Sequence, residues 1–262
     1  MGKKGTTMAP ETADKRPGPF TRKSRYILVI EANTNDLFTT AMLLNRFSYP
    51  VCTARNARQA LDMVSVAMPA LVVTDVMLHG MSGLELMRVL GSNPHTFSIP
   101  IILLMQPGET GREMDVENGS QYVLRKPLEI EELYRAVQAV MELTPRRNLR
   151  VPATLPVTVN KEPLDDVRGE CATHISAQGL YIRTFKYHAP GEQLSLLVII
   201  NGRTINTDAT VLYTRRQDSG PFSEPGMAVK FTRIMAEDRE FIRQYVRDEV
   251  TKGIVTELPV AG

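Results

Sequence analysis

The feature that most constrains the fold is an alternation of apolar runs and amphipathic segments over residues 26–143. The continuous runs are 26–30, 70–73, 101–104 and 122–124, with a shorter one at 51–53. Uninterrupted apolar runs are typical of strands that are covered on both faces. The segments between them place apolar residues at helical spacing, as over 57–64 and 130–141. We therefore predict an α/β fold, a doubly wound five-stranded parallel sheet between helices.

Several chemically active side chains follow these predicted strands. Glu31 and Ala32 come after the first strand, Asp75 after the third, Met105 after the fourth and Lys126 after the fifth. In open sheets of this class, sites lie beyond the carboxyl ends of the strands. Carboxylates and an ammonium that meet there suit phosphoryl transfer to Asp75, with a metal ion neutralising the phosphoryl oxygens.

A longer motif surrounds the predicted phosphoacceptor. The run Asp75-Val76-Met77-Leu78-His79-Gly80-Met81-Ser82-Gly83 and the pair Lys126-Pro127 resemble the receiver domain of two-component response regulators. The resemblance extends over 26–143 and implies a flavodoxin-like fold. It also implies that Asp75 is the phosphoacceptor and that Lys126 pairs with the phosphoryl group.

The same resemblance implies a Mg²⁺ site formed by Glu31, Asp75 and the backbone carbonyl of Met77. Ala32 stands where the family has a second acidic residue, and losing a carboxylate weakens a Mg²⁺ site. Met105 stands where the family has a Thr or Ser hydroxyl, and a thioether cannot donate a hydrogen bond. We therefore expect the Mg²⁺ site to be weak or absent.

The aromatic switch position of receivers differs as well. Val123 occupies it, three residues before Lys126, and Tyr122 is expected to point to the other face of the strand. We predict a degenerate receiver, in which Asp75 and Lys126 are vestigial and phosphorylation does not drive a switch.

The pattern changes after Pro145. Strand-like runs then follow one another with glycines between them: 153–160, 170–175, 180–184, 194–200, 204–215 and 227–231. Short strands at this spacing predict a small antiparallel β-barrel. One helix over 236–250 closes the pattern. We expect its stripe of Arg239, Arg243 and Arg247 to be solvated and paired with local acids.

Two short motifs lie early in this second pattern. Arg146 and Arg150 form an R-x-x-x-R pair just before the first strand, and His174-Ile175-Ser176-Ala177-Gln178-Gly179 follows. Together they resemble the PilZ domain, a bacterial receptor for cyclic di-GMP, whose motifs are R-x-x-x-R and [D/N]-x-S-x-x-G. The resemblance covers about 146–250. It implies that Arg146, Arg150, His174, Ser176 and Gly179 bind cyclic di-GMP.

The residue types suit a dianionic dinucleotide. Guanidinium groups offer planar forks to phosphate or to the O6/N7 edge of guanine, and a glycine at 179 lets a ligand approach closely. His174 replaces the family's Asp or Asn. A lost charge-assisted hydrogen bond costs about 1.5–3 kcal/mol, so we expect weakened binding.

These patterns divide the chain into a disordered basic tail (1–25), a receiver-like domain (26–144), a PilZ-like domain (145–251) and a C-terminal tail (252–262). Because we expect the helix before Pro145 to reach Thr144, the linker to Arg146 should be very short. The net charge of +2 does not indicate a nucleic-acid partner. Without an apolar run of ~20 residues, we expect no membrane insertion and a cytoplasmic protein.

The preferred hypothesis is a non-enzymatic effector that senses cyclic di-GMP and presents the domains to an unidentified protein partner. A homodimer through the receiver is one arrangement that the resemblance allows. The first alternative is a ligand-free interaction scaffold. The second is a response regulator controlled by phosphorylation of Asp75.

Overall fold

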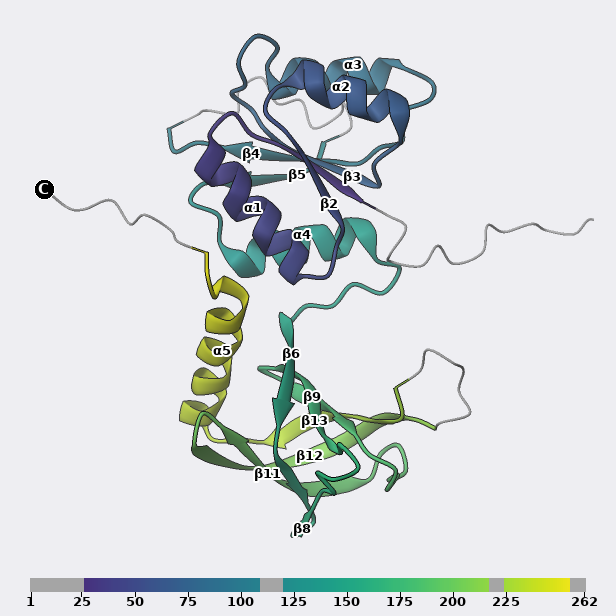
Figure 1. The fold of residues 1–262 in the computed structure, drawn as a ribbon, viewed down its shortest axis with the longest axis vertical. Helices are drawn as coiled ribbons and strands as arrows, with labels where there is room; N and C mark the ends of the chain where they lie inside the picture. Colours follow the sequence, from purple (N-terminus) through teal and green to yellow (C-terminus); the bar gives the residue numbers. More distant parts are fainter. Residues whose placement is uncertain (1–25, 109–119, 217–223, 255–262) are drawn as a thin grey trace, which may run out of the picture.

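A computed structural model of the protein describes residues 26–108, 120–216 and 224–254. They form two folded parts stacked along the long axis of the molecule (Figure 1). The predicted N-terminal tail and most of the predicted C-terminal tail lie outside the described residues. No helix among the described residues is both long and apolar enough to cross a lipid bilayer.

The N-terminal part is built on a parallel sheet. Its strands are β1 (Ile27–Ile30), β2 (Val51–Ala54), β3 (Leu71–Asp75), β4 (Ile101–Met105) and β5 (Ser120–Arg125), in the order β2-β1-β3-β4-β5. Helices α1 (Thr34–Arg46) and α4 (Ile130–Met141) cover one face, and α2 (Ala57–Val66) and α3 (Gly83–Ser92) cover the other (Figure 1). The predicted doubly wound sheet is confirmed, because β1, β3 and β4 are buried along their whole length.

Local sequence fixes the helix starts at the carboxyl edge of this sheet. The Asn33 side chain caps α1 by accepting hydrogen bonds from the backbone N–H groups of Asn35 and Asp36. Ser82 and Glu85 form a capping box at the start of α3. A Cβ on Gly83 would lie 2.1 Å from the carbonyl oxygen of Asp75, so only glycine lets α3 begin this close to β3.

The C-terminal part is a curled antiparallel sheet with a helix. The strands are β6 (Arg150–Leu155), β7 (Val157–Val159), β8 (Glu162–Pro163), β9 (Cys171–Ser176), β10 (Gly179–Arg183), β11 (Gln193–Ile200), β12 (Arg203–Arg215) and β13 (Gly226–Arg233). Their order is β6-β9-β10-β13-β12-β11-β7-β8, followed in sequence by α5 (Ala236–Thr251). The predicted barrel is thus a half-barrel whose apolar inner face is continuous with the α1/α4 face of the receiver-like sheet.

The connection between the two parts is longer than predicted. Helix α4 ends at Met141 rather than near Thr144, and residues 142–149 lead to β6. A chain of hydrogen bonds lies at this end of the helix: Gln138 Nε2 donates to the Tyr49 hydroxyl, which donates to Glu142 Oε1, each over 2.8 Å. The Arg146 backbone N–H donates to Gln138 Oε1 over 3.0 Å, so the connection is anchored on the receiver side.

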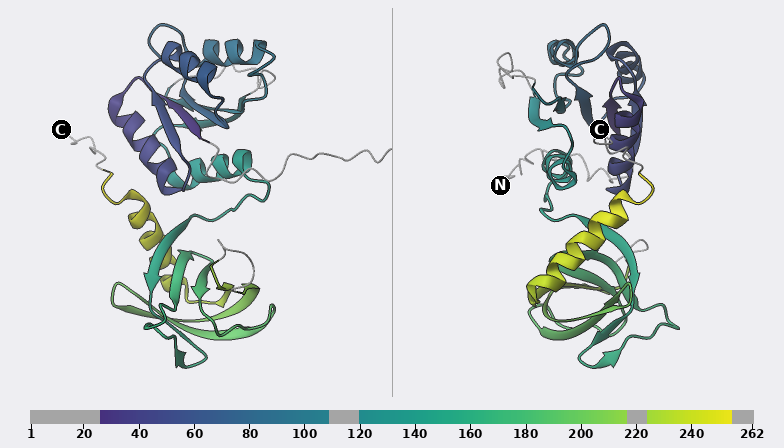
Figure 2. Two further views of the ribbon diagram at one scale, coloured as in Figure 1. Left: turned by 45° about the vertical axis from the view of Figure 1, so that its right-hand side comes forward. Right: turned by 90° about the vertical axis from the view of Figure 1, so that its left-hand side faces the viewer.

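Helix α5 rises from the barrel to the receiver-like part (Figure 2). Its Arg247 Nε lies 2.5 Å from Glu131 Oε1 on α4, and Arg46 Nη2 of α1 donates to the Lys252 carbonyl over 3.1 Å. Within the described part of the chain, only Arg243 of the predicted stripe forms a local ion pair, with Glu240. The expectation of purely local pairing is therefore wrong for Arg247, because α5 ends against the other domain.

Candidate functional site

A pocket of about 180 Å³ lies on the outside of the half-barrel next to the connection. Its lining residues are Arg146, Arg150, His174, Tyr181, Tyr213, Arg215 and Glu224. The structure therefore brings together both arginines and the histidine that the sequence predicted. The other four residues were missed, because Tyr181, Tyr213, Arg215 and Glu224 all lie outside the positions of the two motifs.

Strand pairing explains how distant residues share this face. Arg150 on β6 pairs with Ser176 on β9, His174 on β9 pairs with Tyr181 on β10, and Tyr181 in turn pairs with Ala228 on β13. Ala228 also pairs with Tyr213 on β12. Paired residues lie on the same side of a sheet, so this register places these residues on one outward face across five neighbouring strands.

The two arginines carry uncompensated charge. Neither guanidinium forms an ion pair with any described residue, although Arg150 hydrogen-bonds with Tyr213. Burial lowers the pKa of Arg150, and the nearby charge of Arg146 lowers it further. Because both groups repel each other in a partly desolvated place, an anion bound between them would be stabilised.

His174 is half-buried beside Tyr181, with ring centroids 6.5 Å apart in an edge-to-face arrangement. Burial lowers the pKa of His174, and Arg150 and Arg146 lower it further against the opposing effect of Glu224. The ring is therefore neutral at pH 7. Its Nδ1 lies 3.2 Å from the Thr173 hydroxyl oxygen, which donates to Glu224 Oε2 over 2.9 Å.

Ser176 and Gly179 are not among the residues that line the pocket. The Ser176 hydroxyl donates to the Gly179 carbonyl over 3.2 Å and so closes the β9–β10 hairpin. A Cβ on Gly179 would lie 2.1 Å from the Val229 carbonyl oxygen on β13. Glycine is therefore required at position 179 because the backbone of β13 lies close to it. The sequence had suggested a different reason, the close approach of a ligand.

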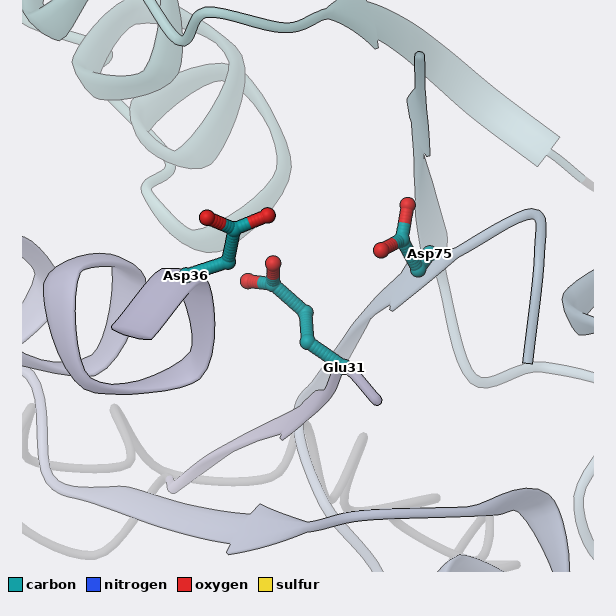
Figure 3. A group of neighbouring side chains, drawn as sticks. All are labelled: Glu31, Asp36 and Asp75. Carbon is teal, nitrogen blue, oxygen red and sulfur yellow. The ribbon is translucent and has the colours of Figure 1, made fainter. Parts of the chain in front are cut away.

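A second cluster of charged groups lies at the carboxyl edge of the parallel sheet. Glu31 follows β1, Asp36 lies in the first turn of α1 and Asp75 ends β3, with their carboxylates turned toward a common space (Figure 3). Lys126 Nζ lies 2.6 Å from Glu31, 2.7 Å from Asp36 and 2.9 Å from Asp75. Asp36 was missed, although its position one turn into a capped helix after β1 could have indicated it.

The electrostatics of this cluster are dominated by Lys126. Burial alone lowers the pKa of Lys126, but the charge of Glu31 and the hydrogen bonds that Lys126 donates to Asp36, Glu31 and Asp75 outweigh burial and raise it. Burial raises the pKa of Glu31, and Lys126 only partly opposes this effect. Three carboxylates face one ammonium, so the cluster keeps an excess of negative charge when all groups are ionised.

This donor set fits a divalent cation. Oxygens of Glu31, Asp36 and Asp75 lie within 4.8 Å of one another, and Glu31 Oε1 is buried without a hydrogen-bond partner among the described residues. Asp36 thus adds a third carboxylate to the predicted pair of Glu31 and Asp75, and the expectation of a weak or absent Mg²⁺ site stays a prediction. Mg²⁺ would compete with the Lys126 ammonium for these oxygens.

The other residues that differ from the receiver motif lie on β4 and β5. The Met105 side chain is buried at the end of β4, where it offers no hydroxyl. Tyr122 and Val123 on β5 are 39% and 37% exposed, so neither is locked into the core. Met77 lies in the loop after β3 with its side chain exposed.

Several known proteins are similar in sequence to a little less than half of this chain. PhoB, the phosphate regulon transcriptional regulatory protein of Pseudomonas aeruginosa, is 32% identical over 119 residues, which cover 45% of this chain and 52% of PhoB. PilH of the same organism is 23% identical over 44% of this chain and 96% of PilH. Response regulator PleD of Caulobacter vibrioides is 30% identical over 45% of this chain. This chain spans about half of PhoB and 26% of PleD.

Among solved structures, a putative response regulator from Chloroflexus aurantiacus is 25% identical, with a TM-score of 0.42 over 44% of this chain and 96% of its own. Residues 27–138 match the response regulator receiver domain family, and residues 144–248 match the PilZ domain family. The five-stranded parallel sheet and the curled antiparallel sheet with its closing helix agree with these two matches. The chain therefore consists of a response regulator receiver domain followed by a PilZ domain.

Proposed function

We propose that this protein is a signalling effector that binds cyclic di-GMP through its PilZ domain. The observation that supports the proposal is the pocket shared by Arg146, Arg150 and His174, in which neither arginine is neutralised by a described carboxylate. PilZ domains in general bind this ligand, and the two domain types are regulatory rather than catalytic.

The chemistry of the pocket suits a dianion that carries two guanine bases. Guanidinium forks bind phosphate oxygens or the O6/N7 edge of guanine, and Tyr181 and Tyr213 offer aromatic surfaces for contact with a base. At about 180 Å³ the pocket is smaller than the 300–1,000 Å³ of enclosed ligand sites. The ligand would therefore lie over the barrel face, with the connection 142–149 ordering around it.

Titration calorimetry with cyclic di-GMP tests the proposal directly. Substituting Arg146→Ala and Arg150→Ala together should weaken binding by at least about 100-fold, because each charge-assisted hydrogen bond contributes about 1.5–3 kcal/mol. The matched control is Arg168→Ala with Arg233→Ala, which removes the same charge from side chains that are 69% and 89% exposed and lie outside the pocket. An equal loss in both double variants, or no heat with the parent protein, would contradict specific binding.

We further propose that the receiver works without phosphorylation and serves as a docking module for a protein partner or a second copy. Met105 cannot donate to a phosphoryl group, and Lys126 already holds all three carboxylates. Incubation with a small phosphodonor and Mg²⁺, followed by intact mass measurement, should show no added phosphoryl group. A mass increase that Asp75→Asn abolishes would favour a phosphorylation-controlled regulator instead.

A further inference from the structure

The hydroxyl of Thr173 links Glu224 to His174 and so restricts where the imidazole carries its proton. An ionised carboxylate can only accept hydrogen bonds, so the single hydroxyl proton of Thr173 is used in the 2.9 Å bond to Glu224 Oε2. The 3.2 Å contact between the Thr173 oxygen and His174 Nδ1 is then a hydrogen bond only if Nδ1–H donates and the Thr173 oxygen accepts. Neutral His174 therefore carries its proton on Nδ1.

The remaining ring nitrogen, Nε2, is then an acceptor. No hydrogen bond between Nε2 and a described residue is present, and the ring lines the pocket that holds Arg146 and Arg150. Asp or Asn at this place in the PilZ motif would also present an acceptor. Resting on the proposed function, we propose that Glu224, acting through Thr173, fixes His174 in the tautomer whose Nε2 accepts an N–H from the guanine base of the ligand.

Glu224 is held well enough for this positioning role. Its Oε1 lies 3.4 Å from Arg183 Nη1, and its backbone carbonyl accepts a hydrogen bond from the Tyr181 hydroxyl over 2.5 Å. A β-bulge between β9 and β10 inserts Thr173 beside His174, so both side chains reach the same group. Sequence motifs cannot show this link, because Glu224 is 50 positions beyond His174 in the chain.

The first test is the tautomer itself. Nitrogen-15 spectra of the full-length protein at pH 7.5, with His174 assigned by comparison with His174→Asn, should show a protonated Nδ1 and an unprotonated Nε2. Thr173→Ser keeps the hydroxyl and should leave this pattern unchanged, whereas Thr173→Val should shift it. A protonated Nε2 in the parent protein would overturn the proposal whether or not the protein binds nucleotide.

The second test is a set of calorimetric titrations with cyclic di-GMP. Thr173→Val should weaken binding about three- to tenfold, the value of one neutral hydrogen bond, and Thr173→Ser should bind like the parent. In a His174→Asn background, Thr173→Val should have no effect, because the Asn carbonyl accepts without help. The same loss in both backgrounds would mean a structural role only and overturn the proposal.

A parent protein that shows the expected tautomer but no heat with cyclic di-GMP would refute the proposed function and the ligand contact together. It would leave the proton position established by the spectra. Thermal melting of each variant identifies any that fail to fold, and the spectrum of the parent protein still decides the proposal if Thr173→Val is one of them.

Discussion

Arg150 and Lys126 are two partly buried cations in opposite situations. Arg150 lies next to Arg146 with its pKa lowered by burial and by that like charge, and no described carboxylate compensates it. Lys126 lies within 2.9 Å of three carboxylates, and its pKa is raised. At the residue scale, one domain thus leaves positive charge available for an anion, whereas the other surrounds its cation with excess negative charge.

Replacing Lys126 should destabilise the fold, because the negative charges of the three carboxylates then lack their counter-ion. Lys126→Met leaves Glu31, Asp36 and Asp75 facing one another, and removing one partner of a buried ion pair costs about 3 kcal/mol or more. We expect a lower melting temperature that millimolar Mg²⁺ partly restores, since the cation replaces the ammonium. The control is Lys252→Met, because the Lys252 side chain is 71% exposed. Equal melting temperatures for both variants would contradict this prediction.

His174 should give the protein a pH-dependent stability. Its folded pKa lies below the ordinary value of 6.5, so the unfolded chain binds more protons as the pH falls past 6.5. The contribution of His174 to stability is therefore present above pH 6.5 and is lost as the pH falls toward the folded pKa. Denaturant unfolding at pH 7.5 and pH 5.5 should show a smaller difference for His174→Asn than for the parent. An unchanged difference would exclude this effect.

At the scale of elements, β9 and β10 carry the pocket residues His174 and Tyr181, and β13 pairs with β10. Gly179 on β10 lies against the β13 backbone, and Gly83 makes a similar close approach between α3 and β3. Both glycines were singled out in the sequence as members of motifs. In the structure each one lets a neighbouring element lie close to a strand that carries a site residue, Tyr181 on β10 or Asp75 on β3.

Gly179→Ala should therefore destabilise the PilZ domain. The added Cβ would lie 2.1 Å from the Val229 carbonyl oxygen, and overpacking of this kind costs about 1–3 kcal/mol. The matched control is Gly91→Ala, in α3, where a Cβ meets nothing within 4 Å. That control should be neutral or stabilising by up to about 1 kcal/mol. Equal unfolding midpoints for the two variants would contradict the packing argument.

The sequence predicted elements better than it predicted contacts between them. Periodicity located the five parallel strands and the two terminal helices of the domains, because burial on one or two faces leaves a local pattern. It missed the end of α4, where Gln138 and Glu142 hydrogen-bond with Tyr49 from far along the chain. It also missed Asp36, Tyr213 and Glu224, since only strand register and helix placement bring them to their sites.

At the scale of the whole molecule, the domains touch through the connection and through α5. Arg46 and Glu131 of the receiver contact Lys252 and Arg247 of the closing helix. One buried apolar cluster extends from the receiver face into the half-barrel. These contacts connect the two domains directly, although the linker between them is longer than the sequence predicted.

Breaking the ion pair between α4 and α5 should loosen the domains with little loss of stability. The Glu131 and Arg247 side chains are 28% and 42% exposed, so Glu131→Gln should cost less than about 1 kcal/mol. Hydrogen exchange near residues 247–254 should nevertheless accelerate. Arg247→Met should have the same effect, and the double variant should add nothing further. Additive changes would show that the two side chains act independently.

Arg146 belongs to both halves of the protein at once, since its backbone N–H is bound by Gln138 of the receiver while its side chain lines the pocket. Thermodynamic reciprocity then applies if nucleotide binding breaks the hydrogen bond of that amide to Gln138. A second ligand that displaces Gln138 would change the affinity for nucleotide by the same factor by which nucleotide changes the affinity for that second ligand. A protein partner that binds α4 would thus change the concentration of second messenger at which the protein responds.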